Sequence, residues 1–399
     1  MAALPGPEWL REARARAWER FASSDRPRAD EEVWRYSRID DFDLGAYVPA
    51  APVPASSPVG RLPDAVEAVG RRSGLIVIHN GWVERAEVDP DLAASGVVVG
   101  PLAREPEAPG HWPAGGPDAY VDWAGAFMAN GVLVRVPRRV VVPYPIVVVN
   151  YIDGDGAAVA GRTHVETGEG AEVTVVEHSG SADVVAVAAP VVVLDAGDGS
   201  HLAHLSVQEL GRRVWQLGYQ TSRTGRDATL QSFAVALGGA YARLRTDARM
   251  EGSGATNNLL AAYFGDGDQM HDFRTLQEHV APKTTSDLLF KGALRDTAHS
   301  VYSGLIRVRR GAAGTNAFQT NRNLVLSEGA HADSVPNLEI DENDVSCSHA
   351  SAVGPIDEEQ RYYLESRGIP SDAAERLIVL GFFEDIVGRA PVAGVASVL

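Results

Sequence analysis

The hydrophobic positions near the start of the chain repeat at helical spacing. Between Glu8 and Ser24, apolar side chains recur with arginine and glutamate between them, at Trp9, Ala13, Ala17 and Phe21. This spacing predicts an amphipathic helix with one buried face. The proline-rich segment Tyr47 to Pro63 is predicted to be a linker or an extended loop.

From Leu75 onward the pattern changes to short apolar runs bounded by glycine, aspartate or proline, which predict strands. Turn-like positions before a strand recur at nearly constant intervals, at Gly170, Gly199, Arg226 and Gly254. No helical pattern separates these strands, which argues against β-α-β crossovers. A sandwich, an antiparallel barrel and a parallel β-solenoid remain, and the regular period favours the solenoid, because each coil must return to its start after a fixed path length.

After Gly354 the helical period returns. Asp357 with Gln360 forms a capping-box pair that predicts a helix ending at Gly368, and Asp372 with Glu375 predicts a second helix to about Val387. The chain is therefore divided into an N-terminal helical region with a linker (residues 1–70), a β-strand region with a β-helix core (71–355) and a C-terminal helical region (356–399).

The last predicted helix carries two apolar stripes about 150° apart. One contains Ile378, Phe382 and Ile386, and the other contains Leu377, Leu380, Phe383 and Val387. One stripe can pack on the end of the solenoid, so the other needs a second surface, either within the same domain or on a partner. Residues 341–385 hold eleven acidic residues and three arginines, a net charge of −8, which suits a basic or neutral partner.

Composition narrows the class of protein. The chain has 36 basic and 53 acidic residues, a net charge of −17, which argues against binding to nucleic acid or to a membrane surface through basic residues. A single cysteine excludes an intramolecular disulfide. The start of the chain has no apolar signal segment, and the longest apolar run, Val184 to Leu194, is shorter than the roughly 20 residues of a membrane helix. We therefore expect a soluble, cytoplasmic protein.

The absence of common catalytic motifs argues against several enzyme classes, whereas one segment contains candidate metal ligands. The chain has no P-loop, no GxSxG and no HExxH motif. Candidate metal ligands are concentrated between His331 and His349, in HADSVPNLEIDENDVSCSH. Cys347 and His349 are two residues apart, so on a strand they share one face, and a thiolate beside an imidazole suits zinc, Fe(II) or an iron–sulfur cluster.

Two interpretations of this pair stay open. The alternative to a metal site is a cysteine that packs as a small hydrophobic residue beside a histidine bonded to the backbone. Iron–sulfur clusters usually have four protein ligands, so a chain with one cysteine can only share a cluster with another chain. Five further histidines of the strand region are interpreted as structural, namely His201, His204, His271, His279 and His299.

The C-terminal half of the chain resembles the SufB/SufD family of iron–sulfur cluster assembly scaffolds. The resemblance lies in GTNAFQTNRNLVLSEGAHADSVPNLEIDENDVSCSHASAVGPIDEEQRYYLESRGI and the following GFFEDIV, and EEVWRYSRIDDFDL is similar to the family's EExWRYT element. Thr320 stands where SufB-type chains have a cysteine in TQCDSML. The Cys347-Ser-His349 element stands where they read VEHEATTS. Both differences resemble the SufD type.

This resemblance implies a right-handed parallel β-helix between helical terminal regions, and a scaffold without enzymatic activity of its own. It implies a heterodimer with a SufB-type paralogue and docking of a SufC-type ATPase on the C-terminal helices, for which the stripe of Ile378, Phe382 and Ile386 is the expected surface. His349 is expected to hold a transient iron–sulfur cluster at the heterodimer interface, with Cys347 beside it.

No cofactor is expected to stay bound to the isolated chain. Flavin binding by the complex and a homodimer of the isolated chain are left open. The main alternative function is that of a β-helix lyase or hydrolase acting on carbohydrate, against which stands the lack of an identifiable acid/base pair.

Overall fold

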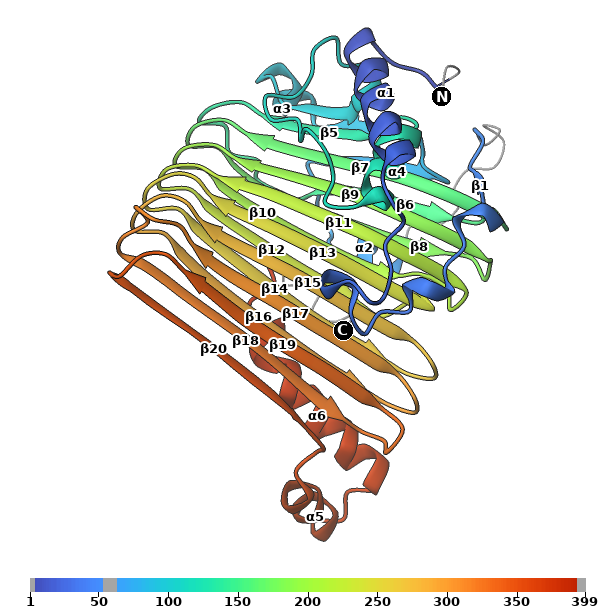
Figure 1. Cartoon of the computed structure of the whole chain (residues 1–399), viewed down its shortest axis with the longest axis vertical. Helices are drawn as coiled ribbons and strands as arrows, with labels where there is room; N and C mark the ends of the chain where they lie inside the picture. The colour runs from blue at the N-terminus through green and yellow to red at the C-terminus, as the bar shows by residue number, and fades with distance from the viewer. Residues whose placement is uncertain (1–3, 53–62, 393–399) are drawn as a thin grey trace.

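The computed structural model describes residues 4–52 and 63–392, and it is built around two ten-stranded sheets that run along the molecule (Figure 1). Sheet A contains β4 (Val98–Pro101), β5 (Val132–Val136), β7 (Ala157–Thr167), β9 (Ala186–Ala196), β11 (Val214–Thr224), β13 (Tyr241–Met250), β15 (Met270–His279), β17 (His299–Val308) and β19 (His331–Ile340), with β1 (Val48–Pro49) paired to β7. Sheet B contains β2 (Gly74–His79), β3 (Trp82–Val88), β6 (Ile146–Ile152), β8 (Glu172–Ser181), β10 (His201–Glu209), β12 (Thr229–Ala236), β14 (Thr256–Gly265), β16 (Thr285–Leu294), β18 (Thr315–Val325) and β20 (Val345–Gly354).

The chain alternates between the two sheets, so each coil adds one strand to each. From β5 in sheet A and β2 in sheet B to the last strands, neighbours within a sheet pair in parallel. Residues one coil apart along the chain are direct partners, as Leu202 is of Leu230 and Leu230 is of Asn257 in sheet B. The predicted parallel β-helix is confirmed, and the sandwich and the antiparallel barrel are excluded.

Residues with positive φ begin the coils where the sequence predicts turns. Gly170, Gly199 and Gly254 have φ values of 64°, 65° and 75°, a conformation that glycine adopts without strain. In the remaining coil Asp227, with φ of 54°, takes this role in place of the predicted Arg226. Aspartate tolerates the left-handed region better than most residues, which explains the shift by one position.

The N-terminal end of the solenoid is closed. There β2 pairs with β3, and β4 with β5, in antiparallel fashion. Nearby, helix α4 (Ala119–Phe127) packs on β7, β9 and β11 of sheet A, and helix α1 (Glu8–Ser23) packs on α4. The predicted first helix is confirmed, with Ala13, Ala17 and Phe21 buried. Arg14 is also buried, and its Nε donates a hydrogen bond of 2.9 Å to the carbonyl of Met128.

Short elements complete the described chain. They are α2 (Asp64–Glu67), α3 (Pro90–Ala94) and the 3-10 helices η1 (Glu32–Trp34), η2 (Ile39–Asp41), η3 (Leu44–Ala46) and η4 (Leu102–Arg104). Within the predicted linker, residues 48–49 pair with β7, and residues 53–62 lie outside the described part of the chain.

The segment around η1 covers the outer face of sheet A through a buried ionic network. The Arg243 guanidinium lies 3.6 Å from the centre of the Trp34 ring and donates hydrogen bonds to Asp272 at 2.6 Å and to the carbonyl of Val33 at 2.9 Å. Arg274 donates to Asp272 and to the carbonyl of Arg35. The N-terminal motif, the segment EEVWRYSRIDDFDL, is thus attached to strands β13 and β15.

Two helices follow the last strand, α5 (Glu358–Ser366) and α6 (Ser371–Val387), as the sequence predicts. The Asp357 carboxylate caps α5 by accepting from the backbone of Glu359 and Gln360. The second capping prediction is wrong in detail, because α6 begins directly after Pro370 without a side-chain cap. Pro370 occupies the N-cap position and has no side-chain acceptor for the free N–H groups of the first turn.

Candidate functional site

The Cys347-Ser-His349 element lies on β20, the last strand of sheet B. In the parallel register Cys347 pairs with Ala317 and His349 with Gln319, and both of these β18 residues are buried inside the solenoid. Side chains alternate along a strand, so Cys347 and His349 share the inner face, as the sequence predicts.

The two side chains have different surroundings. Cys347 is half-buried against the apolar cluster of Ile306, Val308 and Ala317, and this burial raises the pKa of its thiol. The thiol therefore stays protonated at neutral pH until a metal or a cationic group displaces the proton. His349 is exposed. The structure thus gives an accessible imidazole with a protected thiol next to it.

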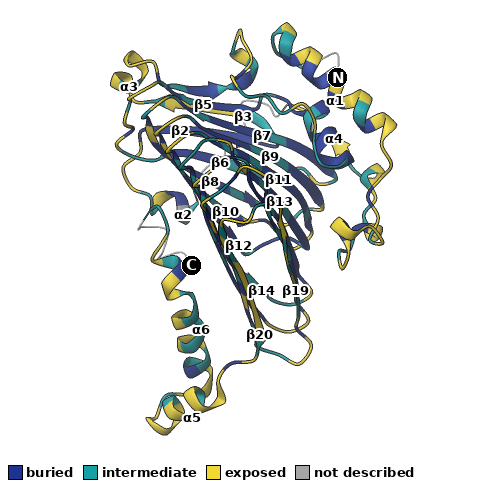
Figure 2. Cartoon of the chain, turned by 60° about the vertical axis from the view of Figure 1, so that its left-hand side comes forward, coloured by how far each residue is buried: buried dark blue, intermediate teal, exposed yellow. Residues whose placement is uncertain are grey.

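The last coil is the open end of the solenoid. Strands β19 and β20 end their sheets, each with one edge that pairs with no other described strand, and none of their residues is buried. The two sheets converge towards this coil (Figure 2), where the Ser351 hydroxyl donates to that of Ser334 at 2.7 Å. Four large apolar side chains are exposed on these two strands and on β18, namely Phe318, Val335, Ile340 and Val353.

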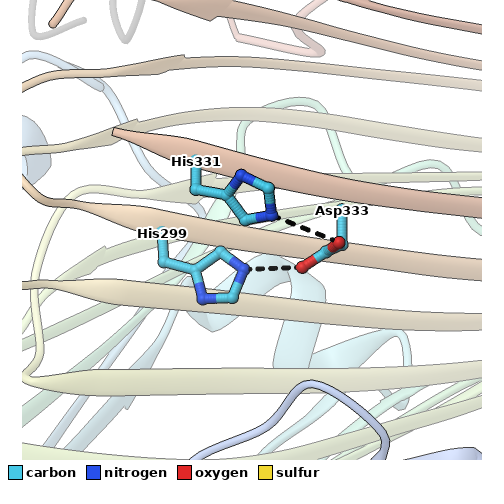
Figure 3. Close-up of side chains that lie close together, drawn as sticks. All are labelled: His299, His331 and Asp333. Carbon is cyan, nitrogen blue, oxygen red and sulfur yellow. Dashed lines mark hydrogen bonds and ion pairs between the residues drawn. The ribbon is translucent and has the colours of Figure 1, made fainter. Parts of the chain in front are cut away.

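The structure divides the predicted nineteen-residue ligand segment between two surfaces. His331 and Asp333 lie on the outer face of sheet A, where they meet His299 of β17 (Figure 3). Cys347 and His349 lie on the inner face of sheet B. From sequence alone His299 is interpreted as structural, although its separation from His331 along the chain is close to the length of one coil.

Three of the five histidines that were expected to be structural are buried, namely His204, His271 and His279, whereas His201 is exposed and His299 meets His331 and Asp333. His271 and His279 are fully buried, and burial lowers the pKa of each to about 4. His271 bonds the carbonyl of Phe264, and His279 bonds the hydroxyls of Thr284 and Ser286. His204 lies inside the solenoid beside Glu177.

Helix α6 packs on the outer face of sheet B and not on the end of the solenoid, which corrects one expectation. Lys291 of β16 is buried beneath the helix, where it forms an ion pair with Asp385, donates to the carbonyl of Phe382 at 2.7 Å and lies 4.7 Å from the centre of the Phe382 ring. Arg389 adds a 2.6 Å ion pair to Asp287.

This packing revises the expected partner stripe of Ile378, Phe382 and Ile386. Ile386 is fully buried in its own chain, in a cluster with Leu260 and Ala262 of β14. Phe382 and Ile378 are half-buried, and Ile378 faces α5. Phe383 and Val387 of the second stripe pack against the same cluster, so each predicted stripe is partly covered by its own chain.

The second stripe provides the most exposed apolar side chains of α6. Leu377 and Leu380 are 49% and 52% exposed, and they line an open groove of about 1210 Å³ between α6 and sheet B. On the neighbouring helix α5, Tyr362 and Tyr363 are exposed as well. These four side chains are called the C-terminal apolar surface below.

Comparison with known proteins identifies the family. Residues 150–382 match the model of the SufBD core domain of the SUF system for iron–sulfur cluster assembly. The chain belongs to the SufBD family. It is 32% identical over 388 residues to an iron–sulfur cluster assembly SufBD family protein of Mycobacterium tuberculosis, an alignment that covers 94% of this chain and 89% of the relative.

Two SufBD relatives carry the SufD name. The SufD protein of Bacillus subtilis is 30% identical over 279 residues (69% of this chain and 63% of the relative), and that of Escherichia coli is 32% identical over 226 residues (56% and 53%). The expected SufD type agrees with these relatives. The family places the chain in iron–sulfur cluster assembly and not among carbohydrate enzymes. Among the described helices, none combines the length and the apolar character needed to cross a membrane.

Proposed function

We propose that this SufBD chain is a non-enzymatic scaffold subunit that builds and transfers nascent iron–sulfur clusters in the cytoplasm together with a SufB-type paralogue and a SufC-type ATPase. The observation that carries the proposal is the open last coil. Each of its two terminal strands has one edge that no other described strand pairs with, and one of them presents an accessible histidine beside the chain's single cysteine.

The paralogue pairs with the last coil. Free strand edges are strong pairing surfaces, and β19 and β20 offer one on each sheet. The exposed Phe318, Val335 and Val353 would be removed from water by such a contact. A cluster at this interface takes its remaining thiolate ligands from the paralogue, because Cys347 is the only thiol here. The cluster is cargo that forms between the chains and is passed on.

The ATPase docks on the C-terminal apolar surface. Leu377, Leu380, Tyr362 and Tyr363 are exposed on two adjacent helices, while Lys291 and Arg389 fix α6 to the solenoid. A docked ATPase would therefore act on a helix firmly attached to β16, two strands from β20.

Coexpression tests the assembly as a whole. The full chain is produced with a SufB-type and a SufC-type protein and purified without oxygen, and subunit composition, iron, sulfide, flavin and ATPase activity are measured. The proposal expects a stable complex with ATPase activity on the SufC-type subunit. A chain that remains alone or as a homodimer under these conditions would contradict it.

The isolated chain is expected to hold no stable iron–sulfur cluster. One thiol, with a pKa raised by burial, cannot supply the ligands of a cluster. Anaerobic reconstitution with iron and sulfide, followed by desalting, should leave much less than one sulfide per chain. Stoichiometric sulfide on the isolated chain would show that the partner's thiolates are not needed.

Leu380→Asp is expected to weaken ATPase binding at least about tenfold while the melting temperature changes by only about 2 °C. The new carboxylate would be desolvated without a partner in the complex but stays in water in the free chain. Binding and melting are compared with those of Val141→Asp, an exposed apolar position in the N-terminal part of the solenoid.

A third variant, Ile386→Asp, separates docking from folding. It should lower the melting temperature strongly, because Ile386 is buried in its own chain. Unchanged ATPase binding by Leu380→Asp would remove the C-terminal apolar surface from the proposal.

A further inference from the structure

A cluster of three potential metal ligands lies outside the proposed cluster site. His299 of β17 and His331 of β19 are direct partners in the parallel register of sheet A. Asp333 is two residues beyond His331, so it lies on the same outer face. The backbone of all three is held by a regular ladder, and only side-chain rotation adjusts the ligand atoms (Figure 3).

The spacing of the three groups suits a single ion. His299 Nε2 lies 2.8 Å from one Asp333 oxygen, and His331 Nε2 lies 3.4 Å from the other. One ligand atom from each residue lies within 4.8 Å of those of the other two. Ligand atoms that bind one transition metal at ~2.1 Å lie about 3 to 3.5 Å apart, so small rotations bring the three groups into place.

The charges around Asp333 also favour a cation. On the described strands, most carboxylates that form an ion pair do so with an arginine. Glu339 of β19, for example, pairs with Arg307 of β17. Asp333 has no arginine or lysine partner among the described residues, and its ion-pair partners are the two histidines. Among the described residues, no guanidinium or ammonium group therefore neutralises this carboxylate, which leaves it available to a metal ion.

We propose that His299, His331 and Asp333 form a binding site for one divalent first-row transition metal ion on the outer face of sheet A. Two imidazole nitrogens and one carboxylate are the ligand set of Fe(II) and Zn(II) sites that keep open positions, whereas Mg²⁺ prefers oxygen ligands alone. Asp333 and His299 are 21% and 29% exposed and His331 is 66% exposed, so an ion reaches the site from solvent.

This site does not depend on the proposed scaffold function, because it lies on a different sheet and face from Cys347 and His349. The two sites are therefore tested separately. The full chain, with any affinity tag removed, is titrated without oxygen with Co(II), whose visible absorption reports nitrogen and oxygen ligation. Zn(II) and Mg²⁺ are then added as competitors.

The wild-type chain is expected to bind one Co(II), which Zn(II) displaces and millimolar Mg²⁺ does not. His331→Ala and Asp333→Asn should each weaken binding at least about tenfold, since even residues that only support a ligand change metal affinity by that factor. The matched control is the double variant Cys347→Ser, His349→Ala, which should bind Co(II) as the wild type does. His331 is largely exposed and Asp333→Asn preserves shape, so both variants should fold.

Three results would overturn the site: no Co(II) binding by the wild type, unchanged binding by both His331→Ala and Asp333→Asn, or loss of binding in the control variant. A crystal soaked in Co(II) adds a structural readout. Its anomalous density should lie between the three side chains, and density only at other histidines would contradict the assignment.

Discussion

His349→Ala is expected to leave folding and paralogue binding nearly intact and to cut cluster formation on the assembled complex at least about tenfold. The side chain is exposed on the inner face of the last strand and packs against little of its own chain, so its removal costs little stability. A neutral imidazole can ligate iron, and a protonated one can orient a partner's thiolate. Iron and sulfide content and the absorption of the reconstituted complex measure the loss.

Cys347→Ser is the matched comparison for this experiment. Cys347 is half-buried, its thiol has a raised pKa and the paralogue is expected to supply the essential thiolates, so the effect should be smaller than that of His349→Ala. A His349→Ala complex that forms clusters at the normal rate would remove His349 from the site. A larger effect of Cys347→Ser would make the thiol the main ligand from this chain.

The second large effect is expected at Asp272, where Asp272→Asn should lower the free energy of unfolding by about 3–5 kcal/mol. Burial by itself favours the neutral acid, but Arg243 and Arg274 hold the pKa of Asp272 below its usual value, so the group is an anion at neutral pH. The amide keeps the shape and leaves two buried guanidinium groups without their counter-ion. Urea unfolding followed by circular dichroism measures the change.

Asp195→Asn is the control for this variant. Asp195 pairs with Arg223, whose side chain is 40% exposed, so solvent can replace the lost interaction and the cost should be no more than about 1 kcal/mol. Equal losses for the two variants would contradict the importance of the buried network. Because Arg243 and Arg274 also bind the carbonyls of Val33 and Arg35, Asp272→Asn should expose the N-terminal segment to proteases first.

The course of the solenoid could be predicted from sequence because its turns recur at a nearly constant interval. Gly170, Gly199 and Gly254 mark the start of three coils, Asp227 begins the coil between the last two, and strand patterns follow each of them. The shared face of Cys347 and His349 was predictable for the same local reason, since alternation along a strand needs no knowledge of the rest of the fold.

Other features depend on contacts between distant segments. His299 meets His331 only when the exact register of β17 and β19 is known, and a change of one residue would turn Asp333 to the opposite face. The orientation of α6 was not predictable because its two apolar stripes are similar, and the position of Lys291 decides which side is covered. The hydrogen bonds from Arg243 to the carbonyl of Val33 and from Arg274 to that of Arg35 join segments that lie 210 and 239 residues apart in the sequence.

The open last coil has a consequence for how stability is distributed along the chain. In a stacked repeat protein each coil is stabilised mainly by its two neighbours, but within the described chain the coil formed by β19 and β20 has a neighbouring coil on one side only. Its amide hydrogens therefore exchange with solvent through openings of lower free energy than those of interior coils. In the proposed complex, a paralogue bound at these strands would supply the missing neighbour, and complex formation would then be thermodynamically linked to the ordering of the strand that carries His349.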